Sequence, residues 1–162
     1  MFRLSSRFHM KARESFIRRM ECLGIENIVL KSPDRDRCDF ELDGRVRVAL
    51  RFSRIKPRTR RVTVGGKRYT YVYPSCTFNF HCHGKLIKGV DLVICVVSGR
   101  DDYFCIPLAE ITGKTFCLSC KKMNSIASYH GKYRIYHNTF RGLKEVLAEK
   151  RRIGEESKKQ PP

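Results

Sequence analysis

Acidic residues are scarce in this chain of 162 residues: Asp and Glu number 16 against 34 Lys and Arg, which gives a formal net charge of +18. Such an excess excludes a neutral surface and indicates a polyanionic partner. In a chain without a lipid-binding feature, nucleic acid is the first candidate. The basic residues recur along the whole chain, so binding should depend strongly on salt. A general RNA-associated role, such as that of a ribosomal protein, or simple solubility is the alternative.

Long apolar runs are also lacking. No stretch approaches the roughly 18 apolar residues of a membrane-spanning helix, and the first residues show no apolar signal-peptide segment. We therefore expect no membrane partner and an intracellular location, either cytoplasmic or nucleoid. In a reducing compartment, the eight cysteines are expected as thiols or metal ligands rather than disulfides.

The length suits one domain with a substantial core, and no internal repeat is visible. Apolar periodicity predicts helices over residues 6–23 and 138–152. The stretches between them predict strands at 28–30, 38–54, 62–73, 75–83, 89–97, 103–106 and 115–118. We expect an α/β or α+β fold with a central mixed sheet flanked by helices. Residues 1–153 should form a single domain, and residues 154–162 a disordered tail.

Residues 38–54 combine an acidic strand with a basic one around Asp43-Gly44. Pairing their apolar faces places Phe40 across from Val48 and Leu42 across from Val46, which requires a loop of odd length. Asp39 then lies opposite Ala49 on a polar face, with Arg51 two residues further along that face. The alternative is a surface hairpin with a cross-strand charge pair between Glu41 and Arg47.

This segment resembles the core of the PD-(D/E)-x-K nucleases, the restriction-endonuclease-like fold, and is similar to small homing or restriction-type endonucleases. The resemblance covers roughly residues 6–106. It rests on Asp39, on Gly44 in the turn, and on a strand whose positions 49 and 51 correspond to the Glu and Lys positions of the family's Glu-x-Lys. It implies Mg²⁺-dependent hydrolysis of double-stranded DNA, with Asp39 as metal ligand. A homodimer would suit a palindromic target, but no dimer interface can be identified in the sequence.

Ala49 and Arg51 depart from that pattern. Ala49 cannot bind a metal, and Arg51 keeps the charge of the lysine but loses a tunable amine. We therefore expect DNA binding with cleavage lost or impaired. The alternatives are an alanine introduced to trap a DNA complex, and a substitute carboxylate, for which Glu41 is the best candidate. His81, on the polar face of a later strand, is either a contact to phosphate or water or a solvent-facing imidazole.

A cluster of cations follows, and it leads into a tyrosine-bearing hairpin around Gly65-Gly66. A basic β-ribbon has the right size for a DNA groove, whereas the alternative is an ordinary solvated hairpin. The candidate DNA-binding residues are Arg54, Lys56, Arg58, Arg60, Arg61, Lys67 and Arg68.

Cys117 and Cys120 have the spacing of a zinc knuckle. A single CxxC pair is a weak signal. The other candidate ligands divide between two faces of one strand, with Cys76 and Cys82 on one face and His81 and His83 on the other. We therefore do not expect zinc, and a zinc-stabilised RNA-binding module is kept as the alternative.

Overall fold

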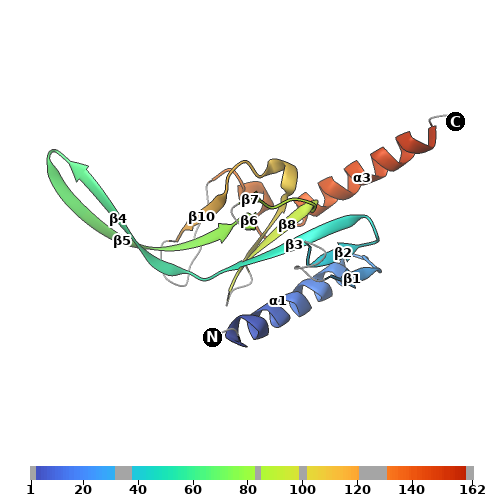
Figure 1. Ribbon diagram of the computed structural model, residues 1–162, viewed down its shortest axis with the longest axis horizontal. Helices are drawn as coiled ribbons and strands as arrows, with labels where there is room; N and C mark the ends of the chain where they lie inside the picture. Colours follow the sequence, from blue (N-terminus) through green and yellow to red (C-terminus); the bar gives the residue numbers. More distant parts are fainter. Residues whose placement is uncertain (1–2, 32–37, 83–84, 99–101, 121–130, 160–162) are drawn as a thin grey trace.

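The structure, a computed structural model, describes residues 3–31, 38–82, 85–98, 102–120 and 131–159. Within these ranges the chain is α+β, with a five-stranded sheet, a three-stranded sheet, a two-stranded hairpin and two long helices (Figure 1). None of the described helices is long and apolar enough to cross a membrane.

The larger sheet has the strand order β1-β2-β3-β8-β9 and is mixed. Its strands are β1 (Ile28–Leu30), β2 (Phe40–Leu42), β3 (Val46–Ser53), β8 (Leu92–Val97) and β9 (Tyr103–Pro107). Only β3 and β8 pair in parallel. Parallel neighbours need a long crossover, and here residues 54–91 form it and contain two of the three strands of the smaller sheet.

The smaller sheet is antiparallel and has the order β10-β5-β4. It consists of β4 (Lys56–Val64), β5 (Lys67–Asn79) and β10 (Thr115–Ser119), while β6 (His81–Cys82) and β7 (Lys85–Leu86) form the short hairpin. β10 pairs only with residues 75–79 of β5. The rest of β5 and the whole of β4 form a two-stranded ribbon that extends away from the body (Figure 1).

Both long helices, α1 (Arg3–Cys22) and α3 (Arg141–Lys159), cover the same face of the larger sheet. Phe16 of α1 and Leu143 of α3 belong to one apolar cluster with Leu50 of β3. The helices were expected to flank the sheet, so their placement together on one face is a difference from that expectation.

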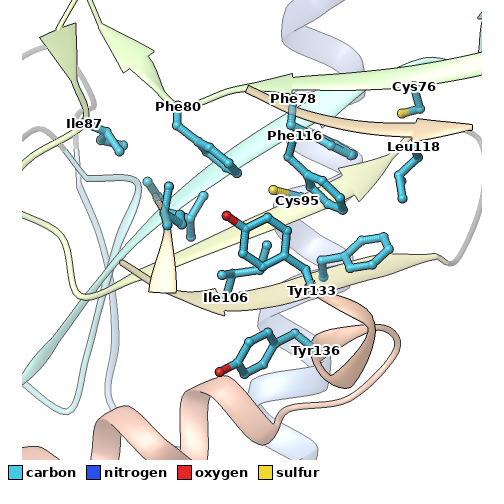
Figure 2. Packing of buried hydrophobic residues seen from close by; sticks show 14 of the residues in the cluster. Cys76, Phe78, Phe80, Ile87, Cys95, Ile106, Phe116, Leu118, Tyr133 and Tyr136 are labelled. Atoms are coloured by element: carbon cyan, nitrogen blue, oxygen red, sulfur yellow. The ribbon is translucent and has the colours of Figure 1, made fainter. Parts of the chain in front are cut away.

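The other face of the larger sheet is covered by the smaller sheet and by η2 (Arg134–Tyr136). Figure 2 shows Phe78 and Phe116 packed over Cys95 and Ile106. Strands β8 and β9 are therefore buried on both faces, which explains their nearly continuous apolar sequence. The short 3₁₀ turn η1 (Leu108–Glu110) follows β9.

Gly142 allows α3 to approach β9 closely. A Cβ atom at this position would overlap the backbone carbonyl of Cys105, and it would also crowd the ring of Pro107. Only a residue without a side chain permits this backbone contact.

Several sequence expectations are confirmed by the register and the element bounds. Phe40 pairs with Val48 and Leu42 with Val46, across a three-residue loop in which Asp43 and Gly44 have φ of 50° and 63°. The end of α3 differs from the expectation, because residues 154–159, expected as a disordered tail, are helical. No proline interrupts the helix before residue 161, and an ion pair of 2.8 Å between Arg152 and Glu149 supports it. Residues 160–162 lie outside the described residues.

Candidate functional site

Asp39 lies just before β2, and its side chain is buried, with 4% of the residue exposed. One carboxylate oxygen accepts a hydrogen bond from Arg13 Nη2 of α1 at 2.7 Å, and the other accepts from the Leu50 backbone N–H at 2.8 Å. The Asp39 backbone N–H donates to the Val48 carbonyl at 2.8 Å. The carboxylate thus terminates the β2–β3 ladder and ties α1 to the sheet.

Ala49 does not lie on a polar face. It is 1% exposed and packs in the apolar cluster that contains Val93 and Cys95, on the face covered by the smaller sheet. The expectation of a shared polar face for positions 39, 49 and 51 therefore fails at position 49. The alternation of a strand shows which residues share a face, but not whether another layer covers that face.

Arg51, Glu41 and His81 have separate environments. Arg51 donates to the Asn79 carbonyl at 3.2 Å and to the Leu50 carbonyl at 2.9 Å, so it connects β3 with β5. Glu41 lies opposite Arg47 and pairs with Lys31 at 3.7 Å. His81 lies in β6, where its Nε2 atom is buried and has no hydrogen-bond partner among the described residues.

The described residues around Asp39 do not fit a magnesium ion. Mg²⁺ requires oxygen ligands, usually from one or two carboxylates. Ala49 offers none, Glu41 is engaged by Lys31, and an ion at Asp39 would have to displace the Arg13 guanidinium. Nowhere among the described residues do three or more His, Cys, Asp or Glu side chains gather as a metal site.

The ribbon of β4 and β5 carries the predicted basic cluster. Nine residue pairs join the two strands, which gives a length of about 30 Å at ~3.4 Å per residue. The whole segment from 44 to 90 holds twelve Lys and Arg and no Asp or Glu. All seven candidate DNA-binding residues are exposed along it or just before it, namely Arg54, Lys56, Arg58, Arg60, Arg61, Lys67 and Arg68.

The tip of the ribbon is a two-residue turn at Gly65 and Gly66, whose φ angles are 56° and 77°. Two successive positive φ values define a type I′ turn, which matches the right-handed twist of paired strands and favours glycine. The flanking Val, Thr and Tyr residues have high β propensity. Local sequence therefore accounts for a hairpin at this place.

The two faces of the ribbon differ in chemistry. Residues directly opposite each other share a face, and Arg58 pairs with Tyr73, Arg60 with Tyr71 and Val62 with Tyr69. We call this the tyrosine face; it consists of Arg58, Arg60, Val62, Val64, Lys67, Tyr69, Tyr71 and Tyr73. The threonine face consists of Thr59, Arg61, Thr63, Arg68, Thr70 and Val72.

The tyrosine face continues onto the body of the protein. Alternation along β5 places Thr77 on that face, and Thr77 lies opposite Cys117 of β10. The threonine face instead continues into the core at Cys76 and Phe78. The tyrosine face therefore belongs to the outer surface of the smaller sheet.

Cys117 is an exposed thiol at the base of the ribbon. A hydrogen bond with Thr77 lowers its pKa; burial opposes this effect, and a hydrogen bond from Arg58 with its positive charge adds to it. Both contacts measure 3.4 Å to Sγ. The sequence did not predict this environment, because its CxxC spacing indicated only a zinc ligand at Cys117.

Cys117 and Cys120 do not form a knuckle. Strand geometry turns them to opposite faces, so Cys117 is exposed while Cys120 is buried. Cys76 is also buried in the core, and burial raises its pKa to about 11, which disfavours the thiolate that zinc requires. His83 and the side chain of Cys82 lie outside the described residues.

Arg13 is the other residue that sequence reasoning missed. Helix periodicity places it on the apolar stripe of α1, because Phe16, Ile17 and Met20 follow it at i+3, i+4 and i+7. Its guanidinium pairs with Asp39 and lies 5.9 Å from the centre of the Phe40 ring. This position on the apolar stripe is the local signal that distinguishes Arg13 from the other cations of that helix.

Comparisons of the chain with protein-family models, curated proteins and solved structures return no match.

Proposed function

We propose that this chain is a DNA-binding protein that does not hydrolyse its ligand, and that the β4–β5 ribbon is its main contact. The observation that carries the proposal is a ribbon of nine residue pairs, exposed along most of its length, within a segment that contains no acidic residue. A long ribbon solvated on both faces is marginal by itself, and its cations repel one another. A polyanion lying along it relieves this repulsion.

Duplex DNA is the proposed form of the ligand. A two-stranded ribbon fits a major groove about 12 Å wide, where its side chains reach phosphates and base edges. If each of the seven candidate cations neutralises one phosphate, the logarithm of the binding constant should fall with the logarithm of salt with a slope of about −6.

The proposal includes a restriction-endonuclease-like core without the catalytic site. Its support is that Asp39 lies beside β3, at the level of position 49, and that β3 pairs in parallel with β8. The environment of Asp39 supports the absence of hydrolysis, because Arg13 supplies the positive charge that a metal ion would otherwise provide.

The test is fluorescence anisotropy with a labelled duplex over a range of salt concentrations. The ribbon variant Arg60→Ser/Arg61→Ser/Arg68→Ser should weaken binding and flatten the salt slope by about three units. The control Lys144→Ser/Arg151→Ser/Lys158→Ser removes the same charge from exposed positions of α3 and should change binding less.

Three results would contradict the proposal. An equal loss of affinity in the ribbon variant and in the α3 control would mean that net charge alone binds the duplex. Mg²⁺-dependent cleavage by the unmodified chain would refute the non-hydrolytic assignment. Tighter binding of RNA than of duplex DNA at matched salt would replace it with the RNA-binding alternative.

A further inference from the structure

Tyrosine rings are exposed on only one face of the ribbon. Tyr69 is 43% and Tyr71 is 54% exposed. Their ring centroids lie 6.5 Å apart, and the ring planes are inclined by only 24°. The threonine face carries no aromatic residue. Two large apolar rings held in water on a cationic arm suggest a partner that has both flat apolar surfaces and negative charge.

The spacing of the ring centroids is comparable with the thickness of a base. Bases in a strand stack about 3.4 Å apart, so a base inserted between two parallel rings requires about 6.8 Å between the ring planes. The 6.5 Å between the ring centroids is the largest separation that the ring planes can have here, so the two exposed side chains must open to admit a base. Bases stack on tyrosine irrespective of sequence, because every base has an aromatic face.

The cations of the tyrosine face lie beside its rings. Arg60 is directly opposite Tyr71 and Arg58 is opposite Tyr73, at the ~5 Å Cβ separation of paired residues. Lys67 lies two residues before Tyr69 on the same strand and the same face. A row of rings on one strand beside cations on the paired strand suits a single strand of DNA, whose bases stack while its phosphates are neutralised.

We propose that the tyrosine face stacks unpaired bases, with one base between Tyr69 and Tyr71. An intact duplex buries the faces of its bases against one another and shows only their edges in the grooves. The preferred ligand is therefore DNA that has unpaired nucleotides next to a duplex. This inference rests on the proposed function and specifies its substrate class.

The experiment compares an intact duplex with the same duplex carrying a short single-stranded gap. The unmodified chain should bind the gapped DNA more tightly by about 5- to 150-fold, the range for one stacked base. Tyr69→Leu/Tyr71→Leu should lose this preference but keep its affinity for the intact duplex. Tyr69→Phe/Tyr71→Phe should retain the preference because it retains both rings. Thr63→Ala/Thr70→Ala, on the threonine face, is the matched control.

A second measurement uses the absence of tryptophan from the chain, which leaves its seven tyrosines as the intrinsic fluorophores. Single-stranded DNA should quench the tyrosine emission of the unmodified chain, and should quench it less in the leucine variant. Equal affinities for gapped and intact DNA would overturn the inference and leave the proposed function standing. If the phenylalanine and leucine variants lost the preference for gapped DNA equally, the tyrosine hydroxyl groups would be responsible for that preference. This result would also overturn the inference. Salt-insensitive or absent binding of both DNAs would overturn the proposed function itself.

Discussion

Replacing Asp39 by alanine tests whether this residue holds the fold together or serves catalysis. The carboxylate is buried and accepts hydrogen bonds from Arg13 and from the Leu50 N–H. Removing one partner of a buried ion pair costs about 3–5 kcal/mol. Because the Arg13 side chain is 28% exposed, water recovers part of this cost. The Leu50 N–H loses its acceptor as well, at about 1–3 kcal/mol if it stays dry. We expect a net loss near 3 kcal/mol.

The assay is equilibrium unfolding in urea, followed by circular dichroism. Glu41→Ala is the control, because its pair with Lys31 is longer, at 3.7 Å, and partly exposed. Exposed pairs contribute about 0–1 kcal/mol. A cycle of Arg13→Ala, Asp39→Ala and the double variant should give a coupling of about 1 kcal/mol or more.

Two outcomes would refute this assignment of Asp39. A destabilisation no larger than that of Glu41→Ala would show that the buried pair does not hold α1 against the sheet. Alternatively, the variant could remain stable while a Mg²⁺-dependent cleavage activity of the parent chain disappears. In that case Asp39 would be catalytic rather than structural.

Three further predictions concern Ala49, Gly142 and Cys117. Ala49→Glu should cost about 3 kcal/mol or more in urea unfolding, because it buries a carboxylate in the core, and should create no Mg²⁺-dependent cleavage; a stable variant that cuts DNA would contradict this. Gly142→Ala should lower stability by about 1–3 kcal/mol or more, since a Cβ would overlap the Cys105 carbonyl, whereas Gly154→Ala, in open space on the same helix, should be neutral or stabilising. Arg58→Ala should raise the pKa of Cys117, because it removes the Arg58 hydrogen bond and charge that help lower it, so alkylation of Cys117 at neutral pH should slow. Mass spectrometry measures the rate, and an unchanged rate would refute the pairing.

Much of the secondary structure follows from local chemistry. The apolar faces of Phe40 and Leu42, with those of Val46 and Val48, were enough to predict the register of the β2–β3 hairpin. The Gly65-Gly66 pair was enough to predict the turn of the ribbon. These features depend on alternation and turn geometry between near neighbours, which a sequence shows directly.

The candidate site was less predictable. Asp39 and position 49 have the spacing of a catalytic pair, but spacing does not show which groups approach from elsewhere in the chain. Arg13 is 26 residues from Asp39, and the layer over Ala49 comes from strands later in the sequence. The ribbon is also longer than the sequence predicts. The predicted hairpin covers residues 62–73, whereas the pairing of the two strands extends to Lys56 and Ser75.

The sequence by itself determined the strong positive charge, the main strands and the basic, tyrosine-rich hairpin, because these depend on composition and short-range periodicity. Tertiary structure alone decided that Asp39 is enclosed by Arg13, that Ala49 is core, and that three tyrosines of the ribbon belong to the outer surface of the smaller sheet. Each of these depends on the layer that covers a given face, and packing between distant segments determines that layer.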